Sequence, residues 1–210
     1  MIKNIVFDMG KVLVDYDDMI SCNHFAKSEE EALAIHRELF RSPEWIDMDR
    51  GTMTEEEAMV RIKKRLNNPE WNEAAQQCMD HWHEYNLHGK LGMAEVVADM
   101  KHRGYGIYLL SNASTRLRRY QHTLPGFQYF DGTIVSAEEK LLKPEPEIYH
   151  RLFDRYNLKP EECFFIDDLE VNIQGAAACG MRGYCFADGS VEKLKKVLDS
   201  LNADRMAAEN

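Results

Sequence analysis

The chain has 210 residues, a length that suits one core domain carrying an insertion. Hydrophobic residues make up 44% and charged residues 30%, which is typical of an ordinary soluble, globular protein. The formal net charge of −10 argues against nucleic acid and anionic membranes as partners, because both would be repelled. An anionic substrate would therefore need a local positive site.

Cysteine usage and the N-terminal residues both favour the cytoplasm. The five cysteines are odd in number and form no C-x-x-C pair, which indicates reduced thiols rather than a disulfide framework. Asp8 interrupts the first apolar run too early for a signal peptide, and no run approaches the length of a membrane span. We therefore expect a cytoplasmic protein without a membrane partner.

The first predicted element is a strand over residues 2–7, and a helical region follows it. Residues 28–31 and 54–57 both fit a capping box, in which a hydroxyl and a glutamate satisfy the free amides of a helix start. Asn68 and Pro69 offer an N-cap followed by proline at the first helical position. We expect residues 16–90 to form an all-helical insertion.

Strands and helices alternate in the rest of the chain. Short apolar strands are predicted at residues 105–110, 133–135, 163–166 and 183–186. Helices are predicted at residues 146–156, 171–179 and 191–201. This alternation predicts right-handed βαβ units, and hence an α/β fold with a doubly wound, Rossmann-like parallel sheet.

Polar side chains follow the first three strands at their carboxyl ends, where such sheets bind ligands. Asp8 follows the first strand, although a turn before Gly10 would explain it equally well. Ser111 and Asn112 follow the second, where they fit both a helix N-cap and an anion site. Lys143, after the third, precedes a proline that stiffens the backbone presenting its side chain.

Two adjacent carboxylates, Asp167 and Asp168, follow the fourth strand. If they meet Asp8 at one edge of the sheet, three like charges crowd together, which is unfavourable unless a cation neutralises them or a proton is retained. Ligands that are all oxygen indicate Mg²⁺ rather than zinc. Asn172 lies four residues beyond Asp168 on the same helix face and could brace a ligand or a metal-bound water.

In order and spacing, these residues resemble the four motifs of the haloacid dehalogenase-like (HAD) hydrolase superfamily. The motifs, from first to last, are Asp8 with residues 10–13, Ser111 with Asn112, residues 143–146, and Asp167 with Asp168.

The resemblance covers essentially the whole chain and is strongest to small phosphatases, including sugar-phosphate phosphatases, with a helical cap inserted after the first motif. It implies an α/β core domain of residues 1–15 and 91–210, and a helical cap domain of residues 16–90.

The resemblance implies a magnesium-dependent phosphatase acting on a small phosphate ester. Asp8 would attack phosphorus in line and form an aspartyl-phosphate, which water then hydrolyses. Mg²⁺ would be held by the Asp8 carboxylate, by the Gly10 carbonyl, and by Asp168 with Asp167, directly or through water.

The resemblance also implies the substrate contacts. Ser111 and the Asn112 amide would bind phosphate oxygens. Lys143 would neutralise the transferring group and keep Asp8 ionised beside it. Lys143 and the metal together would supply the positive site that an acidic protein needs.

One departure from the family pattern concerns Gly10, which stands where phosphatases commonly carry a second aspartate as general acid and base. Such catalysis is typically worth ~10²–10⁴-fold. Another group, such as a cap residue or water, could supply the proton, or the leaving group could need little protonation, as in aryl, acyl or anomeric sugar phosphates. The cap residues considered for contact with the leaving group are Asp15, Tyr16, Asp17, Trp45 and Arg50.

Two alternatives stay open. A metal-free 2-haloacid dehalogenase also uses an aspartate nucleophile and lacks the second aspartate, but the pair Asp167 and Asp168 would repel its carboxylate substrate. A catalytically weak protein that binds Mg²⁺ and phosphate for regulation would have no chemical reason to keep Asp8, Lys143 and the acidic pair together.

Overall fold

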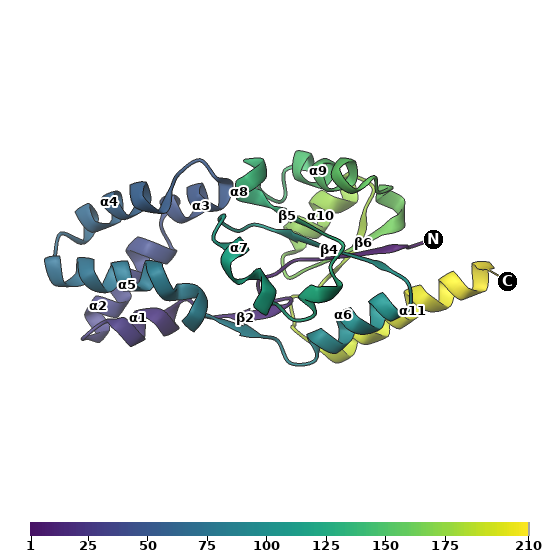
Figure 1. Cartoon of the computed structure of the whole chain (residues 1–210), viewed down its shortest axis with the longest axis horizontal. Helices are drawn as coiled ribbons and strands as arrows, with labels where there is room; N and C mark the ends of the chain where they lie inside the picture. The colour runs from purple at the N-terminus through teal and green to yellow at the C-terminus, as the bar shows by residue number, and fades with distance from the viewer. Residues whose placement is uncertain (210) are drawn as a thin grey trace.

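The computed structural model describes residues 1–209, and side chains only up to residue 201. The molecule is elongated, with a core built around a sheet and a group of helices, α1 to α5, projecting from one end of it (Figure 1). We call this group, residues 19–85, the helical lobe. The chain enters and leaves the helical lobe next to the sheet (Figure 1).

The core sheet has five parallel strands in the order β5-β4-β1-β6-β7, so the first strand is central. The strands are β1 (Asn4–Phe7), β4 (Gly106–Ser111), β5 (Gly132–Val135), β6 (Cys163–Asp167) and β7 (Arg182–Cys185). From β1 the chain adds strands first on one side and then on the other. The predicted α/β fold with a doubly wound parallel sheet is confirmed. The strand order reverses at β1, so the crevice in which such sheets bind ligands lies between β1 and its neighbours.

Successive residues of β1 face opposite sides of the sheet, as the pleat requires. Ile5 and Phe7 belong to an apolar cluster shared with α6 and α11, whereas Val6 belongs to a second cluster shared with α9 and α10. Two helices therefore cover each face (Figure 1). Because both faces are buried, the strands read as continuous apolar runs.

The core helices are α6 (Met93–His102), α7 (Leu117–Tyr120), α8 (Ser136–Glu139), α9 (Pro146–Tyr156), α10 (Glu170–Ala178) and α11 (Val191–Glu209). The bounds of α9 match the prediction, because proline at its first position and Asn157 in the left-handed conformation mark both ends. The predicted helix over 191–201 is longer in the structure, and α6 was not predicted.

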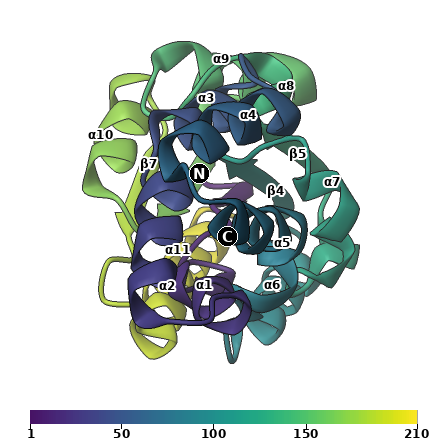
Figure 2. The same ribbon diagram turned by 90° about the vertical axis from the view of Figure 1, so that its left-hand side faces the viewer.

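The lobe helices are α1 (Met19–Phe25), α2 (Glu29–Ile35), a π-helical turn at His36–Phe40, α3 (Pro43–Arg50), α4 (Glu55–Leu66) and α5 (Pro69–Tyr85). Viewed from the lobe end, α1, α2, α4 and α5 stand in front of the sheet (Figure 2). The apolar interior of the helical lobe continues into that of the core, since Ile35, Met79 and Val14 belong to the same cluster as Ile5.

One of the two predicted capping boxes is complete. At α4, the Thr54 hydroxyl accepts from the Glu57 backbone and Glu57 accepts in return from the Thr54 backbone. At α2, Ser28 accepts from the Glu31 backbone, but the Glu31 carboxylate accepts instead from the Lys27 backbone N–H. The prediction of a reciprocal box at residues 28–31 was wrong in this second bond.

A two-stranded antiparallel ribbon joins the helical lobe to the core. It pairs β2 (Val14–Tyr16) with β3 (Leu87–Gly89). The prediction of an all-helical segment over residues 16–90 was wrong here, because strands of three residues carry too little pattern to be recognised. The predicted domain boundaries, at 15/16 and 90/91, fall within or beside this ribbon.

Within residues 1–209, no helix combines the length and the apolar character that a membrane-spanning segment requires.

Candidate active site

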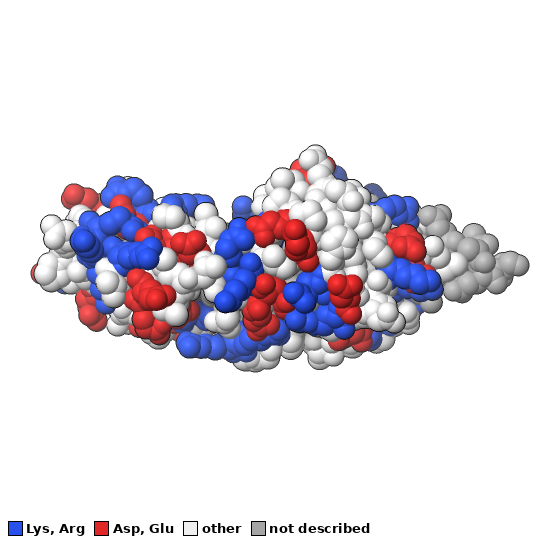
Figure 3. Space-filling model, turned by 90° about the horizontal axis from the view of Figure 1, so that it is seen from above, with Lys and Arg blue, Asp and Glu red and all other residues white. Residues whose placement is uncertain are grey.

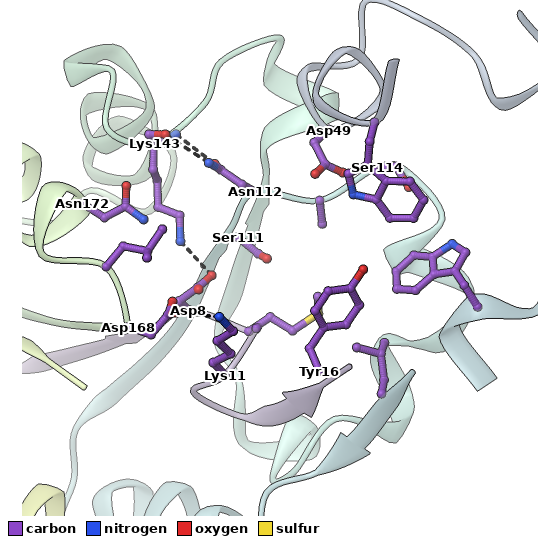
Figure 4. Close-up of a pocket in the computed structure, with 17 residues that line it drawn as sticks. Asp8, Lys11, Tyr16, Asp49, Ser111, Asn112, Ser114, Lys143, Asp168 and Asn172 are labelled. Carbon is purple, nitrogen blue, oxygen red and sulfur yellow. Dashed lines mark hydrogen bonds and ion pairs between the residues drawn. The ribbon is translucent and has the colours of Figure 1, made fainter. Parts of the chain in front are cut away.

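Three of the strand-end residues meet at the carboxyl end of the sheet, around the ammonium group of Lys143. Its Nζ lies 2.7 Å from Asp8 Oδ1 (Figure 4) and 2.7 Å from Asp167 Oδ2, and it donates to the Leu110 carbonyl at 3.0 Å. All three charged side chains are buried. The three charges can be buried together because each has a partner of opposite sign. Any one of them without its partner would carry a large desolvation cost.

Asp167 already has a full complement of donors from the protein. Its Oδ1 accepts from the Leu169 backbone N–H at 2.8 Å and from Asn172 Nδ2 at 3.0 Å. Its Oδ2 accepts from Lys143 at 2.7 Å and from the same Asn172 amide at 3.0 Å. Asn172, predicted to brace a ligand, therefore holds the carboxylate of Asp167.

Asp168 differs from Asp167 because it faces a cavity. It is half-buried, and the Lys11 ammonium lies 4.0 Å from one of its oxygens. Asp8, Asp167 and Asp168 each offer an oxygen within 4.8 Å of the others. Three carboxylates against one buried ammonium leave an excess of negative charge, and the donors are all oxygen. This set fits a hard divalent cation such as Mg²⁺, for which Asp8 and Asp168 are the accessible carboxylates.

The protonation of the site follows from burial and from its charges. Burial raises the pKa of Asp8 to about 7; Lys143 opposes this shift and Asp167 adds to it. Burial and the neighbouring Asp167 also raise the pKa of Asp168. Burial alone would lower the pKa of Lys143, but Asp8 and Asp167 reverse the effect and raise it, so the lysine stays charged. A cation bound here would favour the ionised carboxylates.

Ser111 and Asn112 line the same cavity from the end of β4. The Ser111 side chain points into it (Figure 4). The Asn112 side chain instead forms two hydrogen bonds to the backbone of Lys143. Its Oδ1 accepts from the Lys143 N–H at 2.8 Å, and its Nδ2 donates to the Lys143 carbonyl at 3.0 Å. Asn112 thus fixes the loop that carries Lys143.

The cavity has a volume of about 250 Å³ and lies between the sheet and the helical lobe. Tyr16 stands across it from Asp8 (Figure 4), and the aromatic side chains of Trp45 and Trp82 also line it. The indole rings of Trp45 and Trp82 meet edge to face with centroids 5.3 Å apart, and Tyr16 packs against Trp82 in the same way at 6.3 Å. These three side chains make this part of the wall largely apolar.

Of the cap residues considered for contact with a leaving group, some line the cavity and others form ion pairs outside it. Tyr16 and Trp45 line the cavity. Arg50 instead forms a bidentate ion pair with Glu145 at 2.6 and 3.1 Å, and Asp15 pairs with Lys90.

The sequence did not single out Asp49 on α3, a carboxyl that lines the cavity. Its only signal is the spacing of four residues from Trp45, which puts both on one helix face.

Outside the cavity, the surface carries mixed charge. Basic and acidic side chains are interspersed on the face shown in Figure 3, over both the helical lobe and the core. Inside the cavity, Lys143 supplies positive charge, but it does not by itself balance the three carboxylates grouped there.

Comparison with known proteins agrees with this geometry. Residues 2–180 match the family of haloacid dehalogenase-like hydrolases. The chain belongs to this family. The predicted resemblance is confirmed, and the chain is a hydrolase of the HAD type.

Several curated relatives in this HAD family are phosphatases. The chain is 27% identical over 129 residues to a chloroplast flavin mononucleotide hydrolase of Arabidopsis thaliana, covering 61% of the chain and 50% of the relative. It is 27% identical over 112 residues to the N-acylneuraminate-9-phosphatase of Mus musculus, covering 51% of the chain and 45% of the relative. The chain thus spans about half the length of these two relatives.

Solved HAD structures share the whole fold. A HAD family enzyme of Bacteroides thetaiotaomicron, in complex with magnesium and inorganic phosphate, superposes with a TM-score of 0.70 at 25% identity, covering 88% of this chain and 93% of that one. The L-2-haloacid dehalogenase of Xanthobacter autotrophicus superposes with a TM-score of 0.63 at 19% identity, covering 95% and 83%. The second likeness is one of fold alone.

Proposed function

We propose that this chain is a magnesium-dependent phosphatase that hydrolyses a small phosphate monoester through an aspartyl-phosphate on Asp8. The observation that supports it most is the buried Lys143 ammonium, 2.7 Å from Asp8 and 2.7 Å from Asp167, at the floor of a cavity that also holds Asp168. A nucleophilic carboxylate, a fixed cation beside it and an accessible acidic ligand are the parts that phosphoryl transfer needs.

The proposed reaction has two steps on the same carboxylate. Asp8 attacks phosphorus in line, the bond from phosphorus to the leaving oxygen breaks, and an aspartyl-phosphate forms. Water then attacks this phosphorus and releases inorganic phosphate, which restores Asp8. Lys143 stabilises the charge that develops on the phosphoryl oxygens, while Ser111 donates to one of them.

Mg²⁺ is the proposed cofactor, held by the Asp8 and Asp168 carboxylates and the Gly10 carbonyl. When bound, it neutralises phosphoryl oxygens and keeps Asp8 ionised. Asp167 acts through its hydrogen bonds, because its two oxygens hold Lys143 and Asn172 in position.

The cavity suits a small leaving group with an apolar or flat face, because Tyr16, Trp45 and Trp82 form the outer wall of the cavity. Phosphorylated small metabolites, sugar phosphates among them, are the substrate class we propose. The relatives named as hydrolases of flavin mononucleotide and of N-acylneuraminate 9-phosphate act on molecules of this class.

The two alternatives have less support. A haloacid substrate carries a carboxylate, which the exposed oxygens of Asp168 would repel in the absence of a cation. A purely regulatory binding protein would not require the attacking oxygen of Asp8 to face the same cavity as Lys143.

Phosphate release from p-nitrophenyl phosphate tests the proposal, because this leaving group departs without a proton. We expect turnover that requires Mg²⁺ and disappears with EDTA and in Asp8→Asn. The matched control is Asp154→Asn, which removes an exposed carboxylate on α9 and should keep full activity.

Absence of turnover in folded wild-type protein with Mg²⁺ present would contradict the proposal. So would activity that survives in Asp8→Asn, because another nucleophile would then be at work.

A further inference from the structure

Asp49 lies across the cavity from Asp8, on the side of the helical lobe (Figure 4). In an in-line displacement, the leaving oxygen departs from the side of phosphorus opposite the nucleophile. With Asp8 attacking from the sheet, the leaving oxygen points towards the wall formed by Asp49, Trp45 and Trp82. Asp49 is the carboxyl on that wall.

The end of α3 that carries Asp49 is fastened to the core at three consecutive residues. Ser136 Oγ donates to the Asp49 carbonyl at 2.5 Å. Arg50 pairs with Glu145, in the segment that follows Lys143. Gly51, with φ of 73°, packs so closely that a Cβ would lie 2.0 Å from the Ala137 carbonyl oxygen. Asp49 is therefore held in place against the catalytic end of the sheet, although it belongs to the helical lobe.

The Asp49 carboxyl is half-buried, and the cavity is its opening to solvent. Burial raises its pKa to about 8, opposed by a hydrogen bond from the Ser114 backbone N–H. One carboxyl oxygen accepts that bond, so the other can carry the proton. A carboxyl with a pKa near neutrality is suited both to give a proton to a leaving group and to take one from water.

Other donors in the cavity fit this role less well. Burial raises the pKa of the Tyr16 phenol above its ordinary value, so it is a weaker acid than Asp49. The Lys11 ammonium lies beside Asp168, on the sheet side of the cavity. The indoles of Trp45 and Trp82 can donate a hydrogen bond but do not give up a proton.

The geometry points to Asp49 as the general acid and base of this site, supplying from the helical lobe the carboxyl that Gly10 lacks. This inference rests on the phosphatase function proposed above. In the first step, the bond from Asp8 to phosphorus forms, the bond to the leaving oxygen breaks, and that oxygen takes the Asp49 proton and leaves as an alcohol. In the second step, Asp49 takes a proton from the attacking water, phosphate leaves Asp8, and both carboxyls return to their starting state.

Three esters of similar shape test this role: p-nitrophenyl, phenyl and benzyl phosphate. Their leaving groups need a proton increasingly in that order. We expect Asp49→Asn to lower kcat/KM for benzyl phosphate by ~10²–10⁴-fold and to change kcat/KM for p-nitrophenyl phosphate little. This ratio reports the steps up to departure of the leaving group and not the later attack of water. The matched control is Asp47→Asn, on the same helix but outside the cavity lining, which should change neither.

A rescue experiment distinguishes loss of an acid from loss of structure. A Cβ at Gly10 would meet no atom within 4 Å, so the position has room for a carboxyl. In the Asp49→Asn background, Gly10→Asp should restore part of the benzyl phosphate turnover. A merely structural defect would not be repaired by a new carboxyl on the opposite side of the cavity.

Failure of the inference and failure of the proposed function give different results. No turnover of any ester by the wild type contradicts the phosphatase function itself. If the wild type hydrolyses p-nitrophenyl phosphate but no benzyl phosphate, the site has no working general acid and the inference is wrong. It is equally wrong if Asp49→Asn lowers kcat/KM for all three esters by the same factor, or for none of them.

Discussion

Replacing Lys143 with methionine keeps the aliphatic length of the side chain and removes its charge. The ammonium that is lost lies 2.7 Å from Asp8 and 2.7 Å from Asp167, and all three side chains are buried. Removing one partner of a buried ion pair typically costs about 3–5 kcal/mol, because the remaining charge stays desolvated. We expect Lys143→Met to lose stability in this range near neutral pH, in the absence of divalent cations.

The loss should depend on pH in a defined direction. Burial raises the pKa of Asp8 and Lys143 opposes that rise, so without Lys143 the folded protein holds the pKa of Asp8 further above its unfolded value. A group with a raised folded pKa loses its stabilising contribution as pH rises through that pKa. The destabilisation should therefore be largest at about pH 8 and smaller at about pH 5, where the folded Asp8 carboxyl is protonated.

Urea unfolding of both proteins in EDTA measures this, with Lys11→Met as the matched control. The Lys11 ammonium is exposed and 4.0 Å from Asp168, so its loss should cost at most about 1 kcal/mol. If Lys143→Met is no less stable than Lys11→Met, or if its loss of stability grows towards low pH, then Lys143 does not stabilise the buried carboxylates.

Three further substitutions have expected outcomes. Burial raises the pKa of Asp49 to about 8, so the wild type loses stability as pH rises from about 4 to about 8. By neutral pH, Asp49→Asn should be more stable than the wild type by up to about 4 kcal/mol in urea unfolding. A difference in stability that does not vary with pH would contradict this. Asn172→Ala removes the amide that donates to both Asp167 oxygens at 3.0 Å and leaves each oxygen with one donor. It should cost about 1–3 kcal/mol in thermal unfolding, whereas an unchanged midpoint would show that another donor replaces the amide. Arg50→Gln breaks the partly exposed pair with Glu145 and should raise KM for p-nitrophenyl phosphate about two- to fivefold; an unchanged KM would mean that this pair does not hold α3 in place for substrate binding.

The residues at the floor of the cavity could be predicted from the sequence because a strong regularity places them. Asp8 and Asp167 lie at the ends of apolar runs typical of buried parallel strands, and the carboxyl ends of such strands meet at one edge. Lys143 reaches the same edge from the loop between α8 and α9. The parallel sheet and the bounds of α9 followed from the same patterns, with proline and asparagine marking the helix ends.

The outer wall of the cavity could not be predicted in the same way. Asp49 lies between Met48 and Arg50 on a helix of eight residues, where a carboxylate is most often a solvated surface charge. What distinguishes it is tertiary: the contact of Gly51 with Ala137. The β2–β3 ribbon was missed for a related reason, because its two strands are short and more than 70 residues apart.

The role of Asn112 shows a second limit. Its position at the end of β4 predicted a contact with phosphate, and the residue does line the cavity. The direction of its side chain, however, is decided by the Lys143 backbone, which offers a donor and an acceptor at matching distance. Sequence places a residue at a site, while the hydrogen bonds available to it decide what its side chain can do.

The covalent intermediate is the most direct test of the central claim. Acid quenching during turnover of an aryl phosphate, followed by trypsin digestion and mass spectrometry, would report where the phosphoryl group resides. The expected peptide runs from residue 4 to residue 11, and Asp8 is its only side-chain carboxylate. We expect a phosphoryl group on this peptide in the wild type and none in Asp8→Asn. Phosphate release by the wild type with no phosphoryl group on Asp8 would contradict it.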